Sequence, residues 1–157
     1  MSFEPSQFRR IIEDALAHLG AEATTPEAVE LLMLTAAHET YLGRYLYQIN
    51  LRPVAGGACG VFQMEPKTHD DVQLRLIVKK GRWTWMPLAT ADRMVWDLRY
   101  AIWLARIYYM QFPEPIPEAG RVAAMAKYYK KYWNTAEGKA RIPNVIYNYN
   151  RYVRQVA

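Results

Sequence analysis

Apolar residues recur every three or four positions along most of this chain, a spacing that predicts amphipathic helices. The first run predicts a helix that ends before Gly20. The second has Thr25 as a capping residue and Pro26 in its first turn, and it predicts a strongly apolar helix with Glu39 near its end. The positions that carry these two runs are Phe8, Ile11, Ile12, Ala15, Leu16 and Leu19, then Val29, Leu32, Met33, Ala36 and Ala37.

The remaining sequence predicts further helices around one irregular loop. Residues 50–66 hold three glycines and two prolines, so we expect a loop there with at most a short hairpin at residues 60–63. Short helices are predicted over 71–80, from about 118 to 132 and from about 144 onward, and a long one follows a cap at residues 90–93 and ends at the prolines near 113. The pattern predicts an all-α fold in which residues 1–157 form a single domain.

Composition narrows the class of partner without choosing one. The net charge of +5 and the isoelectric point near 9.3 favour an anionic partner, which nucleic acid, acidic lipid and bacterial cell wall would all satisfy. The first ten residues lack a basic start followed by an apolar run, so no signal peptide is expected. Charged residues interrupt every apolar stretch well before 18 positions, so no membrane insertion is expected.

Glu39 is the leading catalytic candidate because it lies on the flank of an apolar helical stripe. Partial burial there would raise the pKa of its carboxyl, and a protonated glutamic acid can donate to a leaving oxygen. The alternative is an ordinary solvated glutamate. The preceding His38 is typical of a zinc-protease helix, but the second histidine of that motif would fall at Leu42, so the zinc interpretation fails and no metal or cofactor is expected.

Other chemistries find less support in the sequence. Cys59 is the sole cysteine, and no base is placed beside it by sequence, so a loop cysteine is favoured over a nucleophile. The three glycines of the loop match neither phosphate-binding fingerprint. His18 and His69 have no ligand spacing and are expected on the surface or in packing.

Two segments together resemble the lytic transglycosylases and goose-type lysozymes, which cleave peptidoglycan. Glu39-Thr40 is similar to that family's glutamate and hydroxyl residue at a helix end, and residues 57–68, which read GACGVFQMEPKT, are similar to its glycine-rich loop. Weaker similarities cover residues 97–106 and 123–129. The family's third motif usually reads Ala-Tyr-Asn, whereas here Tyr128-Tyr129 precedes Lys130, which leaves open which tyrosine lies over the site.

The resemblance implies a lysozyme-like fold and cleavage of the β-1,4 bond between N-acetylmuramic acid and N-acetylglucosamine. Glu39 would act first as acid and then as base, forming a 1,6-anhydro ring without a cofactor. Substrate-binding roles are implied for Gln63, for the backbone around Phe62 and Met64, and for Tyr128 or Tyr129, with Thr40 behind the glutamate. Asp70, Asp71 and Glu65 are the nearby acids that could instead support a hydrolase.

Two other classes stay open. Family habit and the absent signal peptide indicate a bacteriophage protein that acts from the virion or from the host cytoplasm before release to the periplasm. Such a protein could instead be a structural tail or ejection component that contacts other virion proteins and has lost catalysis. The run Lys127–Trp133 interleaves basic and aromatic residues as nucleic-acid platforms do, although a solvated helix is favoured there.

Overall fold

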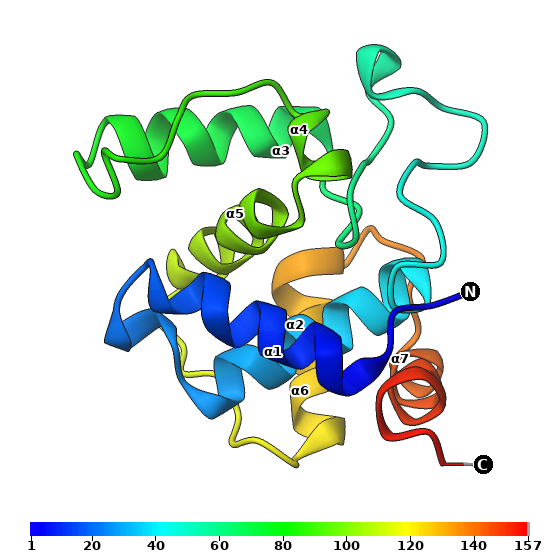
Figure 1. The fold of residues 1–157 in the computed structure, drawn as a ribbon. Coiled ribbons are helices and arrows are strands. Elements are labelled where there is room, and N and C mark those ends of the chain that lie inside the picture. Colours follow the sequence, from blue (N-terminus) through cyan, green and yellow to red (C-terminus); the bar gives the residue numbers. More distant parts are fainter. Residues whose placement is uncertain (157) are drawn as a thin grey trace.

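The computed structural model describes residues 1–156, and its helices pack around one central helix, α2 (Pro26–Thr40) (Figure 1). The Thr25 hydroxyl caps α2 by accepting a hydrogen bond from the Ala28 amide at 3.2 Å. Every side chain from Ala28 to Ala37 is buried, which explains why all of them except Glu30 and Thr35 are apolar. The predicted second helix is confirmed with the expected cap.

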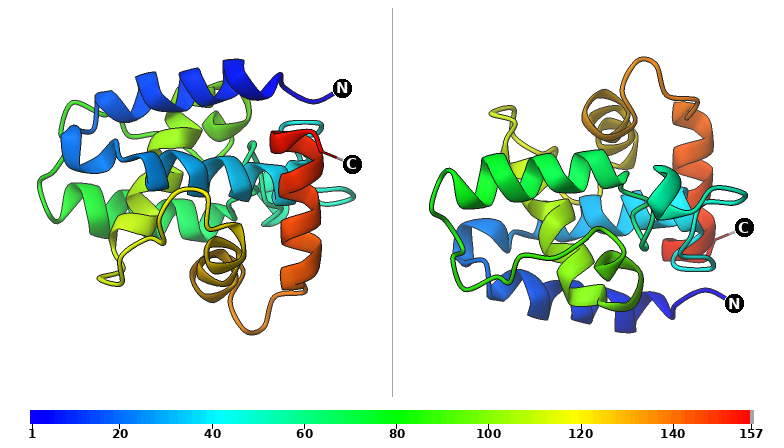
Figure 2. Two further views of the ribbon diagram at one scale, coloured as in Figure 1. Left: turned by 90° about the horizontal axis from the view of Figure 1, so that it is seen from below. Right: turned by 90° about the horizontal axis from the view of Figure 1, so that it is seen from above.

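Four other helices contact α2 and shield it from solvent. They are α1 (Pro5–Ala17), α5 (Leu98–Met110), α6 (Val122–Tyr129) and α7 (Ile142–Tyr149). In Figure 2, α1 lies alongside α2, and the C-terminal helix crosses the end of α2 that carries Glu39. The buried apolar side chains form one hydrophobic cluster, and the fold is mainly helical, as the sequence pattern predicts.

Three helices continue without a break into wider π-helical turns. Helix α3 (Pro66–Asp71) runs into η3 (Val72–Val78), α6 runs into η4 (Lys130–Asn134), and α7 runs into η5 (Asn150–Arg154). The first of these helices begins at Pro66, five positions before the predicted start, because proline fits the first turn of a helix. The last two lie within a few residues of their predicted bounds.

The long helix predicted after residues 90–93 is two helices in the structure. A short helix, α4 (Arg93–Trp96), ends at Asp97, whose backbone is extended with φ −112° and ψ 93°. The Asp97 carboxylate then accepts a hydrogen bond from the Tyr100 amide at 3.0 Å and caps α5. The apolar spacing continues across this break, so periodicity alone could not reveal it.

Residues 50–66 form the predicted irregular loop, which contains one short 3-10 turn, η2 (Pro53–Ala55). Another short 3-10 turn, η1 (Ala21–Ala23), lies between α1 and α2. Cys59 and Met64 exchange two backbone hydrogen bonds of 3.0 and 3.2 Å around a tight turn. This is the short hairpin that the sequence predicts, and residues 1–156 contain no larger sheet.

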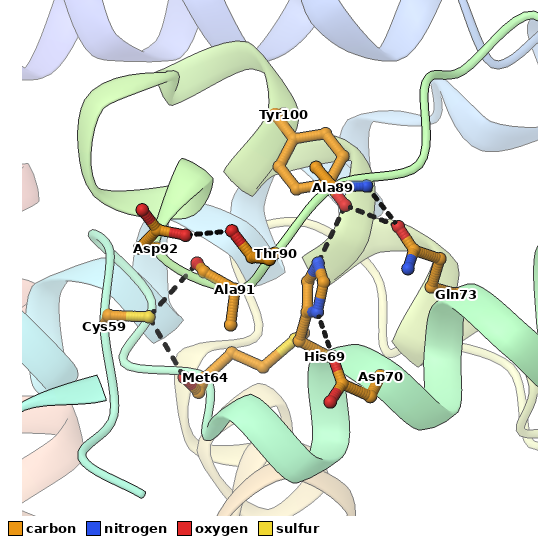
Figure 3. A network of polar contacts seen from close by, with 10 residues as sticks. All are labelled: Cys59, Met64, His69, Asp70, Gln73, Ala89, Thr90, Ala91, Asp92 and Tyr100. Carbon is orange, nitrogen blue, oxygen red and sulfur yellow. Dashed lines mark hydrogen bonds and ion pairs between the residues drawn. The ribbon is translucent and has the colours of Figure 1, made fainter. Parts of the chain in front are cut away.

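A buried histidine ties α3 to α5 behind this loop (Figure 3). The His69 ring contacts the Asp70 carboxylate at 2.8 Å and the Tyr100 hydroxyl at 2.7 Å, one through each nitrogen. Gln73 joins the same network because its Oε1 accepts from the Tyr100 hydroxyl at 3.3 Å, and it also accepts from the Ala89 amide at 2.8 Å. His69 is therefore a packing residue, as predicted. Within residues 1–156, no helix has the length and hydrophobicity needed to cross a bilayer.

Candidate functional site

A cleft of about 650 Å³ opens where the end of α2 meets two loops. Glu39 lies at the end of α2, the glycine-rich loop supplies Gln63 and Met64, and the segment after η4 supplies the opposite wall. Three parts of the chain that are distant in sequence therefore meet at one carboxyl group. Polar surface dominates the lining, which suits a ligand rich in hydroxyl and amide groups.

Glu39 is largely enclosed by protein, but it keeps some exposed surface where it lines the cleft. Desolvation raises its pKa from 4.5 to about 7, because burial penalises the charged form. At neutral pH a large fraction of these carboxyls therefore still carries a proton. Such a group can donate a proton to a bound ligand and later accept one.

Tyr129 from α6 donates a hydrogen bond from its hydroxyl to Oε1 of Glu39. Burial raises the pKa of Tyr129 far above its usual range, and the nearby Glu39 adds to this effect, so the tyrosine remains a donor. This hydrogen bond opposes the desolvation of Glu39 and lowers its pKa, although burial has the larger effect. The structure brings Tyr129 to the carboxyl and resolves the choice that the sequence left open.

Tyr128 points elsewhere. Its hydroxyl donates to the Glu114 carbonyl at 3.1 Å, and its ring borders a separate hollow beside Arg106. Two adjacent tyrosines on a helix face directions about 100° apart, so both could not reach Glu39.

Two further side chains fix the end of α2 around Glu39. The Tyr45 hydroxyl donates to the backbone carbonyl of Glu39 at 2.6 Å and lines the cleft. The His38 ring packs edge-on against Tyr129 with centroids 5.5 Å apart, and its Nδ1 lies 3.0 Å from the amide nitrogen of Asn148 in α7. Burial and the nearby Lys130 lower the pKa of His38, which favours a neutral imidazole.

Thr40 connects the helix end to the glycine-rich loop. Its buried hydroxyl donates to the Val61 carbonyl at 2.8 Å and accepts from the Gly43 amide at 2.9 Å. Thr40 does not line the cleft, which is consistent with a position behind Glu39. The contact fixes the distance between Glu39 and the loop.

Within the loop, Gln63 and Met64 line the cleft and Phe62 does not. Gln63 adopts a left-handed backbone with φ 51°, which is uncommon for a residue with a side chain and is often found at functional sites. Its Nε2 donates to the Gly60 carbonyl at 2.9 Å, which orients the amide. Phe62 is buried against Phe8 and Trp133, so its side chain contributes packing, and the role at the site implied for its backbone stays a prediction.

Sequence reasoning missed the opposite wall, residues 133–138. Asn134 accepts from Lys130 Nζ at 2.6 Å and from the Ala140 amide at 3.2 Å, and Lys130 also donates to the Gly138 carbonyl at 2.7 Å. These bonds close the segment into a compact loop beside Trp133. In the sequence, the only indication of this wall was Asn134, the asparagine nearest to the Tyr128-Tyr129 pair. The rest of the wall could not be predicted, because nothing in the sequence indicates the π turn η4.

Of the three acids that the sequence suggested as a second catalytic carboxylate, only Glu65 lines the cleft. Glu137, which the sequence did not single out, lines the cleft as well. Asp70 instead contacts His69, and Asp71 forms an ion pair with Arg75 at 2.9 Å on the exposed side of α3. Neither aspartate borders the cleft, so they are poor candidates for a second catalytic carboxylate there.

The arrangement disfavours the other chemistries considered. Cys59 is buried, its thiol lies 3.3 Å from the Ala91 carbonyl, and burial raises its pKa to about 11. A thiol with that pKa is a poor nucleophile. Within the part of the chain that the structure describes, no three His, Cys, Asp or Glu side chains gather as metal ligands.

Most aromatic side chains of the basic and aromatic run Lys127–Trp133 take part in packing. Tyr128 and Tyr129 are buried, and Tyr132 stacks on Phe112 with centroids 4.3 Å apart. Of the aromatic rings in the run, only Trp133 lines the cleft, so they do not form a continuous surface on which successive bases could stack.

Comparisons with protein-family models, with curated proteins and with solved structures found no match to this chain. The functional argument therefore rests on the residues and geometry of the cleft.

Proposed function

We propose that this protein cleaves the β-1,4 bond between N-acetylmuramic acid and N-acetylglucosamine in peptidoglycan, as a lytic transglycosylase with Glu39 as acid and base. One observation carries the proposal. The Glu39 carboxyl has a pKa of about 7 at the edge of a polar cleft, and the Tyr129 hydroxyl holds it in place. The motif resemblance around Glu39 and residues 57–68 supports the choice of substrate. The bacteriophage setting stays a prediction.

In the first step, protonated Glu39 donates its proton to the glycosidic oxygen. The bond from that oxygen to C1 of N-acetylmuramic acid breaks, and N-acetylglucosamine leaves with a free 4-hydroxyl. The acetamido oxygen of N-acetylmuramic acid bonds to C1 and neutralises the developing positive charge. A desolvated carboxylic acid suits this step because its raised pKa keeps a proton on the group near neutral pH, where it can be donated to the substrate.

In the second step, the Glu39 carboxylate removes the proton of the C6 hydroxyl. The C6 oxygen attacks C1 and displaces the acetamido oxygen, which closes the 1,6-anhydro ring and regenerates protonated Glu39. The Tyr129 hydroxyl stabilises the carboxylate between the two steps because its hydrogen bond favours the charged form.

The cleft offers groups for both the polar and apolar faces of a sugar. Gln63 and Asn134 provide amide groups in the lining, and Trp133 provides an aromatic ring. Amide groups bind hydroxyl and acetamido groups, and aromatic rings pack on the hydrophobic face of a pyranose.

The decisive experiment is product analysis. Purified protein and its Glu39→Gln variant are incubated with peptidoglycan sacculi, and soluble fragments are identified by mass spectrometry. We expect anhydro-muropeptides from the wild type and a loss of at least about 10³-fold in their rate of release from the variant, because glutamine cannot transfer a proton. A folded variant with retained activity would remove Glu39 from the mechanism.

The same experiment separates two alternatives. Reducing-end products would indicate a hydrolase, and the carboxylates to test next would be Glu65 and Glu137, since both line the cleft. No fragments from the folded wild-type protein would contradict catalysis and favour a structural component of a phage tail or ejection apparatus.

A further inference from the structure

A second hollow of about 710 Å³ adjoins the cleft and lies under the loop formed by residues 47–54. Gln48 lines both hollows, so the two adjoin at this residue. In Figure 1 this part of the chain extends away from the helices, between the end of α2 and the start of α3. The catalytic proposal assigns no role to this loop.

The loop is built to hold its shape. The Gln48 amide donates to the Ala58 carbonyl at 3.0 Å, and the Gln48 side chain accepts from the Ala58 amide at 2.9 Å. At the far end, the Gly57 amide donates to the Arg52 carbonyl at 2.9 Å, and a side chain at Gly57 would collide with the Leu51 carbonyl. These bonds close the loop on itself.

Despite this order, the loop exposes apolar side chains. Ile49 is 72% exposed and Val54 is 93% exposed, and Tyr47 and Leu51 are also open to solvent. Single exposed apolar residues are common, but three of these four, Tyr47, Leu51 and Val54, line one hollow, which indicates a binding surface. Two charged groups border the same hollow, Arg52 on the loop and Asp92 beside α4.

We infer that this hollow binds the peptide that branches from N-acetylmuramic acid in peptidoglycan. The inference rests on the proposed function, since it concerns the same substrate. The peptide carries methyl and methylene groups, free carboxylates and, where it is not cross-linked, an ammonium group. Apolar contacts with Leu51 and Val54, a carboxylate on Arg52 and an ammonium on Asp92 match this chemistry. Because Gln48 borders both hollows, the second hollow lies next to the cleft that would hold the glycan, where a branch of that glycan can reach it.

Direct binding gives the first test and does not require catalysis. The tetrapeptide L-alanyl-γ-D-glutamyl-meso-diaminopimelyl-D-alanine is titrated into the wild-type protein and the Arg52→Glu variant, and backbone amides are followed by NMR. We expect shifts at residues 49–54 and 92 in the wild type, and binding about fivefold weaker in the variant, the effect of one exposed ion pair of about 1 kcal/mol. Arg10→Glu makes the same charge change on the exposed face of α1, away from both hollows, and should bind like the wild type.

Kinetics give the second test. We compare cleavage of intact glycan strands with cleavage of strands from which an amidase has removed the peptides. The wild type should have the lower KM on intact strands, and Arg52→Glu should lose that preference while its rate on stripped strands is unchanged.

The outcomes are distinguishable. Absence of peptide binding, or equal loss in Arg52→Glu and Arg10→Glu, would overturn the inference even if glycan cleavage is observed. Binding of the loop to phosphatidylglycerol vesicles without peptide binding would assign it to a lipid surface and overturn it as well. Peptide binding without glycan cleavage would retain the peptide site and contradict the proposed function.

Discussion

At the scale of single residues, Tyr129 controls how readily Glu39 releases its proton. The hydroxyl of Tyr129 stabilises the Glu39 carboxylate, so its removal should raise the pKa of Glu39 further. The acid form would then persist to higher pH. In Tyr129→Phe we therefore expect the alkaline limb of the pH–rate profile, which reports loss of the acid, to move to higher pH, together with a lower maximal rate.

The neighbouring tyrosine supplies a matched control for this prediction. Tyr128→Phe removes the same hydroxyl from a residue that donates to the Glu114 carbonyl, away from the cleft. Its pH–rate profile should coincide with that of the wild type. An identical shift in both variants would show that the Tyr129 hydrogen bond does not tune Glu39.

The buried carboxyl should also cost stability. Its pKa is about 7 in the folded protein and near 4.5 when exposed, so between these values the folded state binds a proton that the unfolded state has lost. Stability therefore falls as pH rises from 4.5 to 7, by up to about 3 kcal/mol, and the cost remains above pH 7.

Glu39→Gln removes this cost and can still accept the hydrogen bond from Tyr129. The variant should be more stable than the wild type at pH 8 and much closer to it at pH 4.5, as measured by chemical denaturation at both values. A difference that is the same at both pH values would contradict a raised pKa for Glu39.

Residue types near the two main motifs allowed part of the site to be predicted. Glu39 was identified from its place on an apolar helix, whereas Gln63, Met64 and the 128–129 tyrosine pair were implied only by the family resemblance. Glu39, Gln63 and Met64 line the cleft, and Tyr129 contacts Glu39. Glu137 was not, because nothing in its local sequence distinguishes it from a surface glutamate. Its position depends on how the segment after η4 folds back.

At the scale of elements, the link between α2 and the glycine-rich loop depends on the Thr40 hydroxyl. Thr40→Val leaves the Gly43 amide and the Val61 carbonyl without their partner inside the protein. We expect a loss of about 1–3 kcal/mol in the free energy of unfolding. Thr40→Ser retains the hydroxyl and should lose much less, so equal losses in the two variants would indicate a packing effect.

The wall of the cleft depends in the same way on Lys130, which binds Asn134 and the Gly138 carbonyl. Lys130→Met should loosen the loop and reduce kcat/KM by about tenfold, mainly through KM, since 1.4 kcal/mol corresponds to a factor of ten. Lys131→Met is the control, because the exposed Lys131 pairs with Glu114 outside the cleft. A similar loss in both variants would contradict a positioning role for Lys130.

The helices could be predicted because their apolar spacing is a local feature of the sequence. The breaks within them could not be predicted. Asp97 interrupts an apolar series that continues on both sides, and its capping role depends on a backbone turn. The π turns of η3, η4 and η5 likewise arise from packing of whole helices and have no local sequence signature.

At the scale of the whole molecule, the positive charge should promote contact with the anionic cell wall. Binding of the Glu39→Gln variant to purified sacculi, which avoids digestion during the assay, should weaken as salt is raised from about 50 to 500 mM, because ions screen exposed charges. Binding that is indifferent to salt would show that the net charge of +5 does not contribute to wall attachment.

The fold class could be predicted from the sequence because almost every apolar run had helical spacing. The arrangement of the helices in space could not be predicted in this way. The cleft exists because the end of α2, the glycine-rich loop and the segment after η4 converge, and no local pattern specifies that convergence. The buried surroundings of Glu39 come from this packing, and they give the residue its proposed role.

The protonation state of Glu39 is the point on which the catalytic account depends most directly. The measurement is a carbon-13 NMR titration of the glutamate side-chain carboxyls, with the Glu39 signal assigned by its absence in Glu39→Gln. We predict a midpoint at a pH of about 7. A midpoint near the ordinary value of 4.5 would show a solvated carboxylate and contradict the proposed acid.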